Sequence, residues 1–196
     1  MPSSEPFLVT RLSRIRVISL FVVMLITRSA ASDPLPAALQ ADLLVKLAGY
    51  DRSMRARAGA DLRILIVTNN GDTDPTWALQ VKAVLGGFER IAGLAHSESI
   101  VKFTRADALA TTCRADHIAI VVLSPSLVGE GEHIRASFDG VNVLTVTPDQ
   151  ELVRRGVVLG FELVSGKPKL FLNRTQANRQ SVTISAEVMK LMTLYP

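Results

Sequence analysis

Apolar residues recur every three or four positions in the first part of the chain after residue 35. Between Pro36 and Arg57 they fall at Leu39, Leu43, Leu47, Tyr50 and Met54. Side chains at this spacing share one face of an α-helix. We therefore predict a single amphipathic helix over this range, which ends near Gly59 and whose apolar face consists of these five residues.

Further along the chain, short apolar runs are bounded by turn residues and predict strands. They cover residues 62–67, 100–103, 117–123 and 141–146. The run at 117–123 is apolar at every position after His117. A run of this kind is typical of a central parallel strand that is buried on both faces.

Helical patterns separate these strands. Asp74 and Pro75 open one helix, because aspartate supplies an oxygen at the N-cap and proline suits the first turn. This helix is predicted to end or kink at Gly86-Gly87, since each glycine costs about 1 kcal/mol in a helix interior. Shorter helices are predicted at 106–111, after Ser124-Pro125 and through Leu152.

The C-terminal part of the chain has a different pattern. Residues 157–164 and 168–172 are joined by the turn Ser165-Gly166-Lys167, which predicts a β-hairpin. Asn173 begins a helical region that reaches Leu194 with a break near Ser181. The whole alternation predicts an α/β fold with a mostly parallel sheet, flanking helices and an antiparallel C-terminal hairpin.

The first 31 residues have the pattern of a secretory signal peptide. Arg11, Arg14 and Arg16 precede an apolar run at 17–26, and Ser29-Ala30-Ala31 offers the small side chains of a cleavage site. We predict cleavage after Ala31 and a single domain at 32–196 that acts outside the inner membrane. An uncleaved membrane anchor is the alternative, but only eleven residues separate Arg16 from Arg28, and a span needs about 20.

The predicted leader accounts for most of the positive charge. The chain has 22 basic and 18 acidic residues, and four of the former and one of the latter lie at 1–31, so the remainder is nearly neutral. This balance gives no reason to expect nucleic acid as a partner. The tightest basic group, Arg52, Arg55 and Arg57, is interpreted as a solvated helix face.

Residues with chemical potential lie apart along the sequence. His96, His117 and His133 have no metal-binding spacing. A triad of Asp116, His117 and Ser124 is disfavoured, because seven residues of strand separate the last two by about 23 Å. Phosphate-binding and nucleophile-elbow motifs are not found. We predict no catalytic, cofactor-binding or metal-binding residues, and no enzymatic activity.

Several smaller features have structural explanations. Cys113, the single cysteine, is predicted to be a buried small hydrophobe, with an intermolecular thiol as the alternative. The glycosylation sequon Asn173-Arg174-Thr175 is read as a helix N-cap, and Gly129-Glu130-Gly131 as a flexible connection. The oxygen-rich loop 69–74 does not have the residue order of an EF-hand and is read as a turn before a helix.

The same loop, with 124–126 and 147–149, would lie at the carboxyl ends of parallel strands, where α/β sheets bind ligands. A deep apolar cleft there would favour a small-ligand-binding or sensor accessory protein. A flat surface would favour a protein that acts by binding another protein.

Four stretches of the C-terminal third occur in the order and at about the separations found in one known family. They are 143–147 (VLTVT), 155–161 (RGVVLGF), 169–173 (KLFLN) and 182–191 (VTISAEVMKL), and weaker similarity is present at 62–68 and 116–124. On these segments the chain resembles the YfiR family of periplasmic proteins. The aromatic signature of that family's N-terminal helix is only loosely kept at Leu44, Lys46 and Tyr50, and its paired cysteines are missing.

The resemblance implies a periplasmic signalling regulator that acts by protein binding. YfiR-type proteins hold an inner-membrane diguanylate cyclase inactive through the cyclase's periplasmic part, and an outer-membrane lipoprotein relieves this inhibition. The expected partners are therefore a membrane-bound sensor or cyclase and such a lipoprotein, together with a second copy of the chain in a homodimer.

Overall fold

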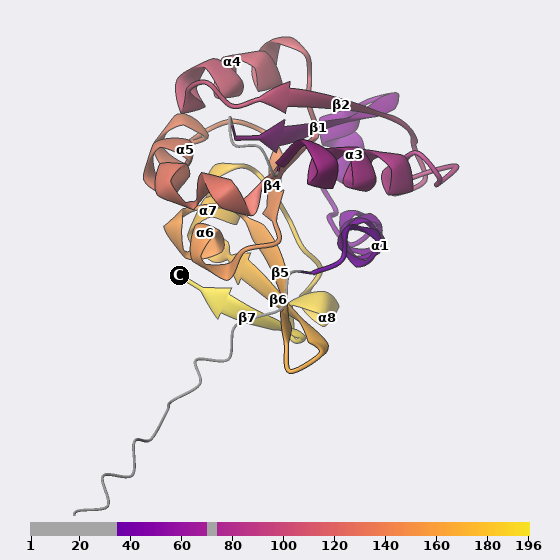
Figure 1. The fold of residues 1–196 in the computed structure, drawn as a ribbon, viewed down its shortest axis with the longest axis vertical. Helices are drawn as coiled ribbons and strands as arrows, with labels where there is room; N and C mark the ends of the chain where they lie inside the picture. Colours follow the sequence, from indigo (N-terminus) through magenta and orange to yellow (C-terminus); the bar gives the residue numbers. More distant parts are fainter. Residues whose placement is uncertain (1–34, 70–73) are drawn as a thin grey trace, which may run out of the picture. The chain divides into compact units, whose positions relative to one another are not determined.

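A computed structural model describes residues 35–69 and 74–196, and within them one sheet of seven strands forms the centre (Figure 1). The strand order is β2-β1-β3-β4-β5-β6-β7. The predicted signal peptide at 1–31 lies outside the described residues, as do positions 70–73 of the oxygen-rich loop. The strands are β1 Asp61–Thr68, β2 Ala95–Lys102, β3 Ile120–Leu123, β4 Leu144–Thr147, β5 Leu159–Val164, β6 Lys167–Asn173 and β7 Met192–Tyr195.

The strand directions confirm the predicted fold class. Strands β2, β1, β3, β4 and β5 run parallel to one another, and β6 pairs with β5 in the antiparallel sense. The turn between β5 and β6 contains Ser165 and Gly166, both with positive φ. The last strand, β7, runs parallel to β6. The sheet is therefore mostly parallel and carries the expected C-terminal hairpin.

Helices cover both faces of the sheet (Figure 1). One face packs against α1, α3 and α8, and the other against α4, the 3-10 helix η1, α5 and α6. Within residues 35–69 and 74–196, every helix is too short or too polar to cross a bilayer. The helices are α1 Ala37–Ala48, α2 Met54–Ala58, α3 Asp74–Leu85, α4 Ala106–Ala115, η1 Pro125–Glu130, α5 Gly131–Ser137, α6 Gln150–Arg155, α7 Arg174–Arg179 and α8 Ala186–Met189.

The alternation of side chains along β1 separates two hydrophobic clusters. Ile64 and Ile66 belong to the cluster under α1 and α3, whereas Leu65 and Val67 belong to the cluster under α4 and α5. Strand β3 is buried at all four positions, as predicted for a central strand with helices on both sides.

The single helix predicted at 36–57 is wrong. Helix α1 ends at Ala48, and α2 begins at Met54. Between them, Asp51 forms an isolated antiparallel bridge with Ile184, and the amide of Arg52 donates to the carbonyl of Thr183. Pairing with a distant segment thus replaces the helical hydrogen bonds at this point.

The C-terminal helical prediction is correct only in part. Helix α7 ends at Arg179 and α8 has four residues, so most of the predicted helix from Asn173 to Leu194 has another structure. The segment Met192–Tyr195 forms β7, which completes the sheet beside β6. The predicted flexible connection at Gly129-Glu130-Gly131 is also wrong, because these residues lie where η1 runs into α5.

Two glycines of the 155–161 segment allow close packing around α6. A Cβ atom on Gly160 would lie 2.3 Å from Cγ2 of Val153. Gly156 ends α6 with φ of 129°, and a Cβ atom there would lie 2.4 Å from the Cβ of Arg135. Any larger residue would therefore push α6 away from β5 and α5.

Candidate functional site

The loops that follow β1, β3 and β4 lie at one edge of the sheet, because these three strands are adjacent and parallel. Ser124 caps η1, its Oγ accepting a bond of 3.2 Å from the amide of Ser126, which confirms the predicted helix start. Asp149 caps α6 by accepting a bond of 2.7 Å from the amide of Leu152. These polar side chains therefore organise the helices that leave the sheet.

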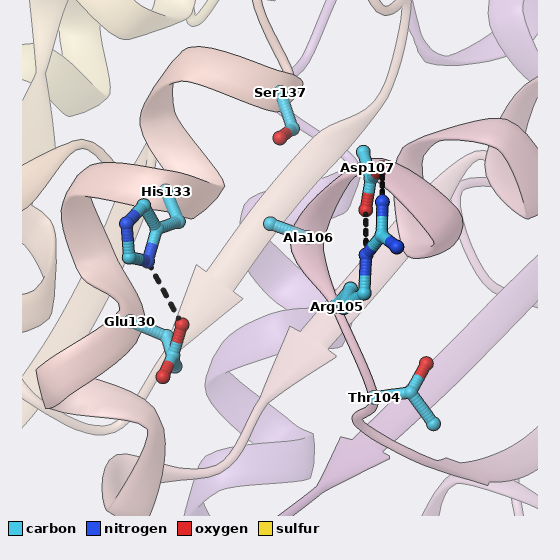
Figure 2. A pocket seen from close by; sticks show the side chains of 7 residues that line it. All are labelled: Thr104, Arg105, Ala106, Asp107, Glu130, His133 and Ser137. Atoms are coloured by element: carbon cyan, nitrogen blue, oxygen red, sulfur yellow. Dashed lines mark hydrogen bonds and ion pairs between the residues drawn. The ribbon is translucent and has the colours of Figure 1, made fainter.

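A cavity of about 390 Å³ lies between α4 and α5, outside the described residues of those three loops (Figure 2). Its lining combines the start of α4 with the end of η1 and with α5. The charged residues come in pairs, since Arg105 pairs with Asp107, and His133 Nδ1 lies 3.1 Å from Glu130 Oε2. The lining residues are Thr104, Arg105, Ala106, Asp107, Glu130, His133 and Ser137.

This lining is charged and open to solvent. The side chains of Arg105 and His133 are 75% and 77% exposed. The hydrogen bond from Arg105 lowers the pKa of Asp107 and raises that of Arg105, so both remain charged at neutral pH. Such a groove can form polar contacts with another macromolecule, whereas ligand-enclosing pockets are mostly apolar.

The three histidines differ in their surroundings. His96 is buried on β2, where Nδ1 faces a carboxylate oxygen of Glu98 and Nε2 lies 2.8 Å from the carbonyl of Phe88. His133 has the partner described above, and His117 is exposed. Among the described residues, no group of three or more His, Cys, Asp or Glu side chains could hold a metal ion.

His117 and Ser124 of the disfavoured triad lie at opposite ends of β3, as predicted. His117 precedes the strand in a left-handed backbone conformation, with φ of 50°. Ser124 follows the strand, is fully buried and caps η1. The structure does not bring these two side chains together.

Comparison with known families identifies the chain. A family model described as YfiR/HmsC-like matches residues 37–193. The chain belongs to this family. YfiR/HmsC-like membership suggests a periplasmic regulator of cyclic di-GMP signalling, and members are regulators that are not known as enzymes. The match runs from the start of α1 into β7, so it includes every described helix and strand except the last two residues of β7.

Solved structures are similar to this YfiR/HmsC-like chain in fold. A conserved domain protein from Vibrio cholerae O1 biovar El Tor is 12% identical, with a TM-score of 0.56, and the alignment covers 81% of this chain and 60% of that one. An ABC domain from Streptococcus pneumonia, solved in complex with L-Trp, is 14% identical with the same TM-score and the same coverage. The chain thus spans about 60% of the length of each. No curated protein matches the chain.

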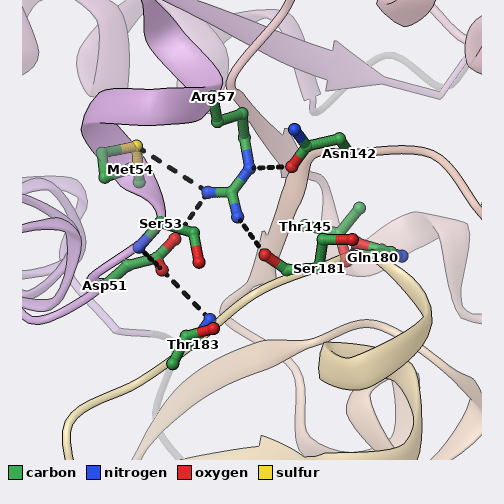
Figure 3. Close-up of polar contacts among 9 residues, drawn as sticks. All are labelled: Asp51, Ser53, Met54, Arg57, Asn142, Thr145, Gln180, Ser181 and Thr183. Carbon is green, nitrogen blue, oxygen red and sulfur yellow. Dashed lines mark hydrogen bonds and ion pairs between the residues drawn. The ribbon is translucent and has the colours of Figure 1, made fainter.

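One arginine of the basic group at 52–57 in this YfiR/HmsC-like chain, Arg57, forms a buried ion pair with Asp51 (Figure 3). The sequence did not predict this pair. Arg57 Nη1 lies 2.5 Å from Asp51 Oδ2, and Nε donates a bond of 2.9 Å to Asn142. Only Arg52 and Arg55 are exposed, so the interpretation of all three arginines as a solvated face is wrong for Arg57. Gly49 and Asp51 lie inside the predicted helix and interrupt its helical pattern. They were the signal in the sequence for the buried Arg57.

The remaining predictions concern single side chains. Cys113 is a free, buried thiol, and burial raises its pKa to about 12. Asn173 caps α7 by accepting from the amide of Gln176 at 2.9 Å, and its Nδ2 donates to the carbonyl of Val153 at 3.0 Å. The N-cap interpretation of the sequon is confirmed, and the nitrogen that would carry a glycan is buried and bonded.

Proposed function

We propose that this protein is a periplasmic regulator that keeps a membrane-bound diguanylate cyclase inactive by binding its periplasmic part, and that an outer-membrane lipoprotein relieves the inhibition. The observation that carries the proposal is the YfiR/HmsC-like match over residues 37–193. That match extends over nearly the whole described domain, which supports a regulatory role for the domain as a unit.

Export is the first element of this proposal. A basic segment, an apolar run at 17–26 and small residues at 29–31 form the leader, with cleavage after Ala31. The start of the family match at residue 37 agrees with a mature domain that begins at Ser32. N-terminal sequencing of the protein from a periplasmic fraction is expected to give Ser32-Asp33-Pro34. Recovery only with the membrane, with the leader retained, would indicate an anchored form.

The surface of the domain supports action by binding. The cavity between α4 and α5 is bordered by charged side chains of both signs that project from two helices (Figure 2). Charged groups at the rim of a contact guide association and set specificity. We place the contact with the cyclase at this groove, with Arg105 and His133 on its two sides.

Deleting the gene and measuring cellular cyclic di-GMP by mass spectrometry tests the function. Loss of an inhibitor is expected to raise the cyclic di-GMP level, and the wild-type gene is expected to restore it. A pull-down from crosslinked cells should recover a membrane protein with a cyclase domain. Unchanged cyclic di-GMP together with no recovered membrane protein would refute the proposal.

Charge reversal tests the assigned surface separately from the function. Arg105→Glu replaces an exposed cation of the groove. Lys82→Glu is its matched control at an exposed position of α3, on the other side of the sheet. Only Arg105→Glu is expected to reduce complementation and partner recovery. Equal effects of the two variants would place the contact elsewhere.

A further inference from the structure

Among the described residues that line the groove between α4 and α5, His133 is the one whose charge changes near neutral pH. Its Nδ1 lies 3.1 Å from Glu130 Oε2 (Figure 2). Because a carboxylate only accepts hydrogen bonds, the neutral ring keeps its N–H on Nδ1, and protonation adds an N–H at Nε2. Histidine ordinarily gains this proton between about pH 8 and pH 5. The Glu130–His133 pair is therefore negative at the upper end of this range and neutral at the lower end.

The other charged groups around His133 are carboxylates and guanidinium groups, which ordinarily ionise outside this range. On α4, Arg105 is bonded to Asp107 and lowers the pKa of that carboxyl. On α5, Arg135 Nη2 lies 2.5 Å from Glu132 Oε2. Helix α6 also packs against α5. The charged residues of η1, α5, α6 and the start of α4 are, besides His133, Arg105, Asp107, Glu130, Glu132, Arg135, Glu151, Arg154 and Arg155. A change between pH 8 and pH 5 therefore alters the charge of the groove at His133.

The neutral imidazole leaves the charge of the Glu130 carboxylate uncompensated on its side of the groove. Both side chains are open to a partner, since Glu130 is 43% exposed and His133 is more exposed still. A complementary protein surface places a cation at such a carboxylate, because opposite charges across an interface favour association and like charges oppose it. When His133 is protonated, it compensates Glu130 and repels the partner's cation.

We propose that the partner places a lysine or arginine against Glu130, and that protonation of His133 weakens this contact and relieves repression in acid. This inference rests on the proposed function, because it concerns the regulation of the same groove. An exposed ion pair changes affinity by at most about fivefold, so the response to pH is graded. Arg105, on the other side of the groove, keeps its charge and supplies a contact that does not depend on pH.

Cellular cyclic di-GMP at two external pH values tests this switch, because the periplasm exchanges protons with the medium. The deletion strain is complemented with each variant, and repression is the cyclic di-GMP level of the uncomplemented strain divided by that of the complemented strain at the same pH. Wild-type repression is expected to be about two- to fivefold weaker at pH 5.5 than at pH 7.5. His133→Gln cannot be charged and should repress strongly at both values. His133→Lys is charged at both and should repress weakly at both.

Two further variants separate the pair from general effects of pH. Glu130→Gln removes the carboxylate that the partner's cation needs, so it should repress weakly at both pH values. His117→Gln is the matched control, because His117 is exposed and lies outside the groove, and it should keep the wild-type response. Urea unfolding of each purified variant at both pH values separates a loss of folding from a loss of binding.

Several results would overturn the switch. They are equal wild-type repression at both pH values, a wild-type response retained by His133→Gln, and a response lost equally in His117→Gln. Stronger repression in acid and by His133→Lys would place an anion of the partner at this site and refute the cation. A deletion that leaves cyclic di-GMP unchanged at both pH values would refute the proposed function, and the switch with it.

Discussion

Arg57 and Asp51 form an ion pair in which the two side chains are 1% and 0% exposed. The pair lies in the corner between α1 and α2, and each member also reaches the C-terminal part of the chain. Arg57 Nη2 donates to the carbonyl of Ser181 at 3.1 Å, and Asp51 Oδ1 accepts from the amide of Thr183 at 3.1 Å (Figure 3). These two charges therefore join segments that are more than a hundred positions apart in sequence.

Removing one member of this pair is expected to be strongly destabilising. Arg57→Met leaves the Asp51 carboxylate buried without its cation, a situation that typically costs about 3–5 kcal/mol. Urea unfolding, followed by circular dichroism, measures the loss in the free energy of unfolding. Arg55→Met is the matched control, because Arg55 is exposed and its replacement is expected to change stability by less than about 0.5 kcal/mol.

A double-mutant cycle shows whether the effect belongs to the pair. Asp51→Asn combined with Arg57→Met removes both charges, so the double variant should be clearly more stable than the sum of the single losses predicts. Strictly additive losses would mean that the two side chains act independently, contrary to the geometry in Figure 3.

Local sequence signals were sufficient for most of the sheet. The apolar run around β3 is enough to predict that this strand is buried. The turn at Ser165-Gly166 is enough to predict that the chain reverses between β5 and β6. Both signals lie in neighbouring residues alone. The cap at Ser124 is equally local, because its Oγ accepts a hydrogen bond from the amide of Ser126, two positions later. These elements were predicted correctly for that reason.

Errors arose where distant contacts decide the structure. The turn at Asp51 exists because residues 183 and 184 supply its hydrogen bonds, and a helical periodicity cannot reveal this. Strand β7 has a sequence compatible with a helix, and its pairing with β6 decides the outcome.

The groove between α4 and α5 could not be predicted from spacing. Arg105 and Glu130 lie on separate elements that follow different strands, and only the parallel order of β1, β2 and β3 brings those elements together.

The thiol of Cys113 is expected to be unreactive in the folded protein. Burial raises its pKa to about 12, so near pH 8 almost none is thiolate, the reactive form. Titration with a disulfide reagent should label one thiol per chain in guanidinium and react very slowly without it. Ser97→Cys, at an exposed position of β2, should add one rapidly labelled thiol. Fast labelling of the wild type, or a disulfide-linked dimer on a non-reducing gel, would contradict the buried location.

Asp149 is expected to make stability depend on pH. Burial raises its pKa above the ordinary value, against the opposing effect of the hydrogen bond from the Leu152 amide. The folded protein then holds the proton more tightly than the unfolded chain. This contribution to stability is present below the ordinary pKa and is lost as the pH rises through the raised one.

Asp149→Asn separates the charge from the cap. The amide oxygen can still accept from Leu152, but nothing ionises, so the variant should be more stable than the wild type at pH 7 and should lose the pH dependence. Asp149→Ala also removes the cap, which is expected to lower the free energy of unfolding by about 1 kcal/mol. Urea midpoints measured across the acid range give these differences, and a wild type more stable than Asp149→Asn at pH 7 would contradict them.

His117 occupies a backbone position that favours glycine. It follows α4 with φ of 50°, and the next amide, of Ile118, donates to the carbonyl of Cys113 at 3.0 Å. This bond and the left-handed residue before it are the features of a Schellman C-cap, where glycine is the preferred residue. A side chain in the left-handed conformation costs roughly 1–2 kcal/mol, partly offset by the lower chain entropy of the unfolded state.

Replacing His117 by glycine is therefore expected to stabilise the protein by up to about 1 kcal/mol, because the imidazole is exposed. Thermal and urea unfolding measure the change. His133→Gly is the matched control, since it exchanges an exposed histidine within α5 and should cost about 0.5–1 kcal/mol. A loss of stability in His117→Gly that equals the loss in His133→Gly would show that the imidazole stabilises the end of α4 by more than the strain of its backbone.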